Sequence, residues 1–228
     1  MDKENRPKIL FLNTGWMKHY NGPAADDPTI GNNFKWLHGE GGHIHGHECH
    51  NFSKAAGLCF GHHPGFVGTD VQRLGGSPGA TSVDGVLVIW FSRSPRTKKA
   101  VIVGWYKNAT VYWKFQKPKR GEGNRLYGDP IWFKASARFD DCTLLPDSDS
   151  DRSFPIPNRY EEPGGYGQSP NWYGLGAKFL EKVWKYVQDR EASQRATSLG
   201  KLSMPPRNDD PFLRVLVEQN AIRVATEF

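Results

Sequence analysis

The sequence has no long apolar segment and few cysteines. No stretch approaches the roughly 20 apolar residues that span a bilayer, so we expect no membrane-spanning helix. The opening residues, Met-Asp-Lys-Glu-Asn-Arg-Pro-Lys, carry charge where a secretory signal would have its apolar core. The three cysteines, Cys49, Cys59 and Cys142, are an odd number at no framework spacing. These absences predict a cytoplasmic protein in a reducing compartment, with its thiols free.

Motifs of nucleophilic and nucleotide chemistry are also scarce. No cysteine stands in a recognisable setting with histidine and asparagine. The glycine-rich segment 164–169 lacks the Lys-Ser/Thr pair of a phosphate-binding loop. Because a helix is predicted to follow it, anion binding there is one interpretation and a tight connection is the other. The acidic run 147–151 is most simply a solvated loop.

What the sequence has in excess is tryptophan and positive charge. The chain of 228 residues contains eight Trp and has a formal net charge of +6. Trp often lies where one edge of its ring stays in water, so many Trp residues favour a binding surface, although a Trp-rich core is the alternative. The basic excess is compatible with a polyanionic partner.

The segment from Val83 to Gln116 predicts the centre of the fold. Three runs rich in β-branched and aromatic residues, separated by a basic turn and by Lys107-Asn108, predict three consecutive strands. Val86 to Phe91 is apolar without a break, so both faces of that strand should be covered. A closed or nearly closed barrel covers both faces of an antiparallel meander. We therefore expect an α+β fold with a small β-barrel and flanking helices.

Two shorter strands are expected on either side of this centre. Residues 8–13 form an apolar run closed by a turn signal. Residues 131–139 alternate strictly, which places Trp132, Lys134 and Arg138 on one outward, basic face of a strand.

Helical spacing appears only towards the C-terminal part of the sequence. The apolar residues from Leu175 onward predict a helix that ends near Gln194. A second helix is expected to begin at Asp209-Asp-Pro211, because Asp is a good N-cap and Pro suits the first turn. The expected organisation is a domain at 1–194, a linker at 195–208 and the start of a following helical region at 209–228. A helix with an apolar face after a linker suggests either a truncated chain or a helix that docks elsewhere.

The histidine-rich segment is the most obvious candidate for metal chemistry. If it forms a strand, alternation places four potential ligands on one face, namely His43, His45, His47 and Cys49. Such a set could close a tetrahedral zinc site, although its spacing matches no zinc finger. A metal-dependent nuclease or hydrolase using these histidines and Glu48 is the corresponding enzymatic hypothesis. The alternative is a polar segment in which one or two histidines touch ligand or phosphate.

Aromatic residues interleaved with basic ones are the stronger pattern. They combine at Trp105-Tyr-Lys, at Tyr112-Trp-Lys and at Trp132 with its basic neighbours. Bases stack on aromatic rings with about 1–3 kcal/mol each, and Lys and Arg hold phosphates. The residues expected to contact a nucleic-acid backbone are Lys107, Lys114, Lys117, Lys119, Arg120, Lys134 and Arg138.

A resemblance to a known family rests on four segments: residues 8–18 (KILFLNTGWMK), 82–90 (SVDGVLVIW), 102–112 (IVGWYKNATVY) and 165–173 (GYGQSPNWY). They resemble the N-terminal, modified-DNA-reading domain of modification-dependent restriction endonucleases. The arrangement is similar to the PUA superfamily, which includes EVE, YTH and SRA domains. Segment 210–228 resembles the start of the nuclease-associated region that follows this domain.

The resemblance implies a small β-barrel that holds a flipped or modified base in an aromatic cage. Carried over to this sequence, the cage residues are Trp16, Trp36, Trp105, Tyr106 and Trp172. Independently of the resemblance, Asn108 and Gln168 are candidates for the polar groups that hydrogen-bond an extruded base in the same pocket. The histidine-rich stretch departs from the family pattern, so the modification that is read stays open.

The leading hypothesis is a non-catalytic reader domain. It binds double-stranded DNA at a methylated or hydroxymethylated cytosine, by base flipping, and targets a nuclease domain in the same or a partner chain. It needs no cofactor, and a homodimer is compatible with it. The alternatives are the metal-dependent nuclease and a protein-interaction domain with an aromatic groove.

Overall fold

The computed structural model describes residues 6–31, 45–63 and 68–202. The chain divides into two compact units, Met1–Leu180 and Glu181–Phe228. The first unit contains the sheet and every side chain discussed below. The described part of the second unit is the remainder of one helix.

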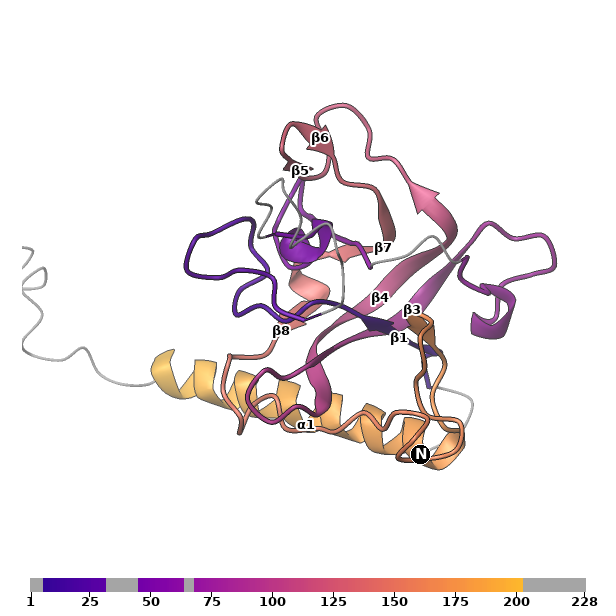
Figure 1. The fold of residues 1–228 in the computed structure, drawn as a ribbon, viewed down its shortest axis with the longest axis vertical. Coiled ribbons are helices and arrows are strands. Elements are labelled where there is room, and N and C mark those ends of the chain that lie inside the picture. The colour runs from indigo at the N-terminus through magenta and orange to yellow at the C-terminus, as the bar shows by residue number, and fades with distance from the viewer. Residues whose placement is uncertain (1–5, 32–44, 64–67, 203–228) are drawn as a thin grey trace, which may run out of the picture. The chain divides into compact units, whose positions relative to one another are not determined.

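Seven strands of the first unit form one mixed sheet (Figure 1). The hydrogen-bonded order is β2-β7-β4-β3-β1-β9, and β8 also pairs with β4. Neighbouring strands are antiparallel except β1 and β3, which run parallel. The bounds are β1 Ile9–Asn13, β2 Leu58–Gly61, β3 Ser82–Arg93, β4 Ala100–Gln116, β7 Phe133–Arg138, β8 Cys142–Leu144 and β9 Asn171–Trp172.

The fold is α+β, as expected, with a mixed sheet and one α-helix among the described residues. The two edge strands of the sheet are β2 and β9. In the described part of the chain no hydrogen-bonded pairing joins these edges, whereas a closed barrel needs such a pairing. The parallel pair β1–β3 is also outside the antiparallel meander that the sequence suggested.

The segment 83–116 contains two long strands rather than three short ones. The basic turn lies between β3 and β4, where it was predicted. Lys107-Asn108, expected to separate two strands, lies inside β4, where the register with β3 shifts. Asn108 has a φ of +48°, a conformation that Asn tolerates better than most residues. The polar pair therefore forms a β-bulge that bends one strand, and it does not end the strand.

Both faces of the apolar run in β3 are covered, which confirms that expectation. Residues 86–91 are all buried. One face packs into the main core cluster through Val86, Val88 and Trp90. On the other face Phe91 contacts Tyr166, with ring centroids 5.0 Å apart. At Phe91 the second cover therefore includes the segment that precedes β9.

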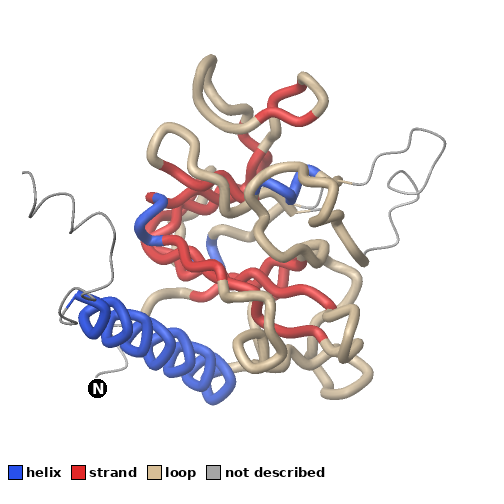
Figure 2. Tube along the Cα trace, turned by 90° about the vertical axis from the view of Figure 1, so that its left-hand side faces the viewer, coloured by secondary structure: helices blue, strands red, loops and turns tan. Residues whose placement is uncertain are grey.

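The predicted strand at residues 131–139 is present as β7. A long loop connects the end of β4 to the start of β7. Within this loop β5 (Arg125–Leu126) and β6 (Asp129–Pro130) form a two-stranded ribbon, with two residues in each strand. Figures 1 and 2 show the ribbon apart from the middle of the sheet, at the outer end of β4 and β7.

The predicted helix is α1, which begins at Ala177 and ends at Leu202, beyond Gln194. The first residues of the expected linker are therefore helical. The helix predicted from Asp209 lies outside the described residues. Within the described ranges no helix is both long and apolar enough to cross a membrane.

Candidate functional site

Two residues of the predicted cage lie in the core. Trp105 and Tyr106 are fully buried in β4, on opposite faces because successive strand side chains alternate. The Tyr106 hydroxyl donates a hydrogen bond to the carbonyl oxygen of Asn51. Its ring packs against Trp90, with centroids 5.4 Å apart. In this structure both rings fill the core and present no face on which a base could stack, contrary to expectation.

Trp16, just after β1, is also buried. Two guanidinium groups of the protein pack on its ring, with Arg96 5.3 Å and Arg152 4.8 Å from the ring centroid. An aromatic ring attracts a cation placed over its face, so the ring of Trp16 is already occupied by two cations of the protein itself. Arg96 also pairs with Asp147 and Asp149 at 2.9 and 2.8 Å. The acidic run therefore binds a cation of the protein.

The remaining predicted cage residues are spread over the fold. Trp172 packs against Phe11 and Phe179, with centroids 4.9 and 5.4 Å apart, and its Nε1 donates to Gly164 O at 2.9 Å. The glycine-rich segment 164–169 leads into β9 and not directly into α1, which was the condition for an anion site at a helix start. Asn108 and Gln168 are exposed, and Trp36 lies outside the described residues. None of the six that the structure describes lines the pocket at residues 117–130 or the cleft at Trp113 and Trp132.

The described part of the histidine-rich segment is not a strand. His47–His50 form the 3-10 helix η3, in which residues two apart do not share a face, so the predicted alternation is wrong for His47 and Cys49. Glu48 is buried, and desolvation raises the pKa of its carboxyl group. Among the residues that the structure describes, no three His, Cys, Asp or Glu side chains are grouped as a metal site requires. His43 lies outside these residues, so zinc binding stays a prediction.

A Gly-x-Ser-x-Gly spacing is present at Gly75–Gly79, around Ser77. In a nucleophile elbow this motif connects a strand to a following helix. Here the order is reversed, because the run follows the 3-10 helix η4 (Gln72–Leu74) and leads into β3. The local structure therefore does not support a serine nucleophile.

A cleft of about 380 Å³ lies near the outer end of β4 and the start of β7. Its lining is Gly68, Trp113, Lys114, Phe115, Trp132 and Lys134. Trp113 is 44% exposed and Trp132 is 48% exposed. Large rings left half in water indicate a binding surface, and the volume is at the small end of the range for ligand pockets, roughly 300–1,000 Å³. We call this feature the aromatic cleft.

The sequence pattern contained both tryptophans of the aromatic cleft, although neither was among the predicted cage residues. The alternation at 131–139 placed Trp132 on an outward face, and its exposure confirms this. Trp113 belongs to the Tyr112-Trp-Lys cluster of aromatic and basic residues. Trp113 differs from Trp105 in its exposure, because Trp113 lies in the outer part of β4 and Trp105 in the buried inner part.

Lys134 departs from the alternation. Predicted to be outward and basic, it is only 1% exposed, and its ammonium donates a hydrogen bond to Trp113 O. Thr69 N also donates to Trp113 O, at 3.0 Å, so residues 68–69 lie beside this part of β4. Burial lowers the pKa of Lys134 to about 8. The side chain is therefore part of the cleft lining and is not a free surface cation.

The histidine-rich and aromatic sequences meet at Phe115. His62 and His63 pack on its ring, with centroids 5.1 and 5.4 Å away. His62 Nδ1 lies 2.7 Å from Trp132 O, so it is the protonated nitrogen of a neutral ring. Burial lowers the pKa of His62 to about 3, in spite of this hydrogen bond. Both rings buttress one wall of the aromatic cleft, and the lowered pKa of His62 keeps that ring neutral near pH 7.

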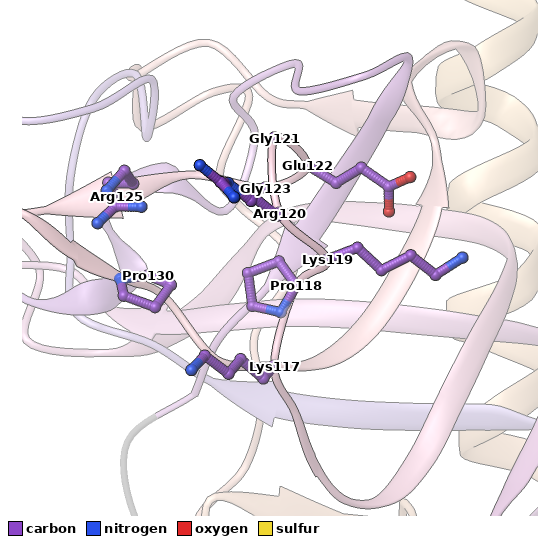
Figure 3. Close-up of a pocket in the computed structure, with 9 residues that line it drawn as sticks. All are labelled: Lys117, Pro118, Lys119, Arg120, Gly121, Glu122, Gly123, Arg125 and Pro130. Atoms are coloured by element: carbon purple, nitrogen blue, oxygen red, sulfur yellow. The ribbon is translucent and has the colours of Figure 1, made fainter.

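A basic loop begins directly after β4 and leads to the β5–β6 ribbon, which precedes β7. A pocket of about 630 Å³ is lined by Lys117, Pro118, Lys119, Arg120, Gly121, Glu122, Gly123, Arg125 and Pro130. Figure 3 shows Lys117, Arg120 and Arg125 on one side of Pro118, whereas Lys119 and Glu122 extend to the other side. Four cations against one carboxylate make this loop, residues 117–125, a concentrated positive surface.

The other predicted backbone contacts have different surroundings. Lys114 is exposed, and its ammonium lies 4.5 Å from the Trp113 ring centroid, at the aromatic cleft. Lys107 is half-buried at the β-bulge, and Arg138 is exposed at the far end of β7. Neither of these two lines the cleft or the loop pocket.

Comparison of the chain with models of protein families, with curated proteins and with solved structures finds no match.

Proposed function

We propose that this chain is a nucleic-acid-binding module that stacks an unpaired base in the aromatic cleft and holds phosphates on the basic loop. The observation that supports it is the pair of half-exposed rings, Trp113 and Trp132, next to four loop cations. Rings that take bases and cations that take phosphates are the two parts of single-strand recognition. A base paired inside a duplex cannot reach the rings, so it must be flipped out or belong to a single strand.

In its more specific form, the proposal is a reader of methylated or hydroxymethylated cytosine in double-stranded DNA. This form rests on the resemblance of segments 8–18, 82–90, 102–112 and 165–173 to modified-DNA-reading domains. A PUA-like barrel, base flipping and a nuclease domain in the same or a partner chain belong to it. The aromatic cleft, rather than the predicted cage, is where we place the flipped base.

The test is binding of labelled duplexes with unmodified, methylated or hydroxymethylated cytosine, together with the matching single strands, over a range of salt concentrations. We expect the logarithm of the association constant to fall linearly with the logarithm of salt, by about 0.7–0.9 for each phosphate that the protein neutralises. Absence of binding to every one of these oligonucleotides at low salt refutes the proposal. Equal affinity for modified and unmodified duplexes refutes only the reading of modified cytosine.

A further inference from the structure

The ammonium group of Lys134 is buried beside the aromatic cleft, and among the described residues it has a single hydrogen-bond partner. It donates to Trp113 O and lies 5.2 Å from the Phe115 ring centroid. An ammonium has three N–H donors, so one bond to a carbonyl leaves two. In the described part of the chain no carboxylate forms an ion pair with Lys134.

Such an arrangement is unfavourable for the protein alone. A buried charge is normally paired or fully hydrogen-bonded, because water no longer solvates it. The lowered pKa of Lys134, about 8, records this desolvation, yet the group is still mostly charged at neutral pH. An acceptor oxygen of a ligand in the aromatic cleft would supply the missing partner.

Two ligand oxygens are candidates, a phosphate oxygen and a keto oxygen of a base. Phosphates already have partners in the exposed cations of the basic loop, which continues directly from the cleft on both strands. The half-exposed rings of Trp113 and Trp132 instead suit a base, which they would guide toward the buried lysine. The position of Lys134 therefore favours a keto oxygen on the edge of a base over a phosphate oxygen as its partner.

Resting on the proposed function, we propose that Lys134 reads a keto oxygen of the base that stacks between the exposed rings of the aromatic cleft. Thymine presents two keto oxygens and cytosine one, whatever its substituent at position 5. Adenine presents none, and its amino donor lies beside both N1 and N7, so it opposes an ammonium. The cleft thus selects keto-bearing bases and disfavours adenine.

The experiment compares short homo-oligomers of dT, dC and dA in binding to the wild-type chain and to Lys134→Met. Methionine keeps an unbranched apolar side chain but removes the donors. For the wild type we expect dT to bind about tenfold or more tightly than dA, with dC between them. In the variant the dT-to-dA ratio should fall to the small value that ring stacking alone produces. Lys114→Met, at the exposed side of the same cleft, is the matched control and should weaken all three oligomers alike.

Other results contradict the proposal in distinct ways. If Lys134→Met weakens dT, dC and dA by one common factor, Lys134 holds a phosphate and the base reading is wrong. If the variant changes no affinity, Lys134 is a purely structural residue. If no homo-oligomer binds the wild type, the proposed function itself fails, which separates the two hypotheses.

A second measurement does not depend on how the variant folds. The dT-to-dA ratio of the wild type should decrease as pH rises from about 6.5 to 8.5, because Lys134 loses its proton near pH 8. The charged or titratable neighbours on the packing elements are Lys114 on β4 and His62 and His63 against Phe115. His62, with a pKa near 3, stays neutral throughout. A ratio that is constant over this range overturns the proposal.

Discussion

Arg152 and Lys134, the two buried Lys and Arg side chains among the described residues of the first unit, differ in how the fold satisfies them. Arg152 donates to the carbonyl oxygens of Met17, Lys18 and Leu145 at 2.6–3.1 Å, and Nη1 lies 3.7 Å from Asp147 Oδ1. Lys134 has one carbonyl partner. A buried cation whose donors are used by the protein holds the fold together. One with donors left over is available to a ligand.

The same contrast appears along β4 itself. Its inner part, residues 100–106, is buried throughout and carries Trp105 within the core. Its outer part carries Trp113, whose ring is half in water. One strand therefore supplies both core and binding surface, and the division follows what packs against each part.

The largest expected effect is on stability, at Arg152. Arg152→Met leaves the carbonyl oxygens of Met17 and Leu145, which are buried, and of Lys18, which is partly buried, without this donor, so we expect a loss of about 3–5 kcal/mol in the free energy of unfolding. Urea denaturation measures it. Arg96→Met, at the exposed side of the same acidic run, is the matched control and should cost about 1 kcal/mol or less. Equal effects of the two variants would remove the distinction between a structural and a surface cation.

The tryptophans of the aromatic cleft should dominate binding. We expect Trp132→Ala and Trp113→Ala each to weaken single-stranded oligonucleotides by about 1–3 kcal/mol, which is roughly 5- to 150-fold. Tyr160→Ala is the control, since this ring is 85% exposed but lies outside the cleft. Fluorescence anisotropy measures the affinities. A loss at Tyr160 as large as at Trp132 would mean that exposed rings act without regard to the cleft.

Lys134 should behave as the opposite of Arg152 in a stability measurement. Lys134→Met removes an incompletely satisfied charge, so the free energy of unfolding near pH 7 should be unchanged or higher by about 1–3 kcal/mol. A loss like that of Arg152→Met would show that the ammonium is structural.

The pH dependence of stability tests the same point. The folded pKa of Lys134, about 8, is below the unfolded value, about 10.4. Between these two values the unfolded chain binds more protons, so the contribution of Lys134 to stability rises with pH from about 8 to 10 and is constant below this window. Urea denaturation across this range should show the rise in the wild type, and the difference between wild type and Lys134→Met should shrink as pH increases. A difference that does not change with pH contradicts the shifted pKa.

The smallest effect is expected at the basic loop. Lys119→Gln with Arg120→Gln should reduce the slope of the salt dependence of oligonucleotide binding by about 0.7–0.9 for each phosphate that these side chains neutralise in the wild type. Base preference should not change, because these cations do not line the aromatic cleft. Lys99→Gln, in the turn between β3 and β4, is the control and should leave the slope as it is. A change in base preference at the loop would contradict the division between base and phosphate recognition.

Local patterns in the sequence were sufficient to predict several elements. Strands were predicted from the apolar runs at 8–13 and 86–91 and from the alternation at 131–139, and the structure has strands there. The spacing of apolar residues indicates whether one or both faces of a strand are buried. The helix from Leu175 was placed close to α1 for the same reason. The bulge at Lys107-Asn108 was not distinguishable from a turn, since a positive φ serves both.

The sequence by itself determined the strands, the helix, the basic excess and the clusters of aromatic with basic residues. Only the tertiary structure decided which ring is core and which is surface, because Trp105 and Trp113 stand in similar local patterns on one strand. It also decided that Lys134 is buried, although the alternation places this residue on the outward face of its strand. Periodicity reports the faces of an element, but exposure depends on what a distant segment places over each face.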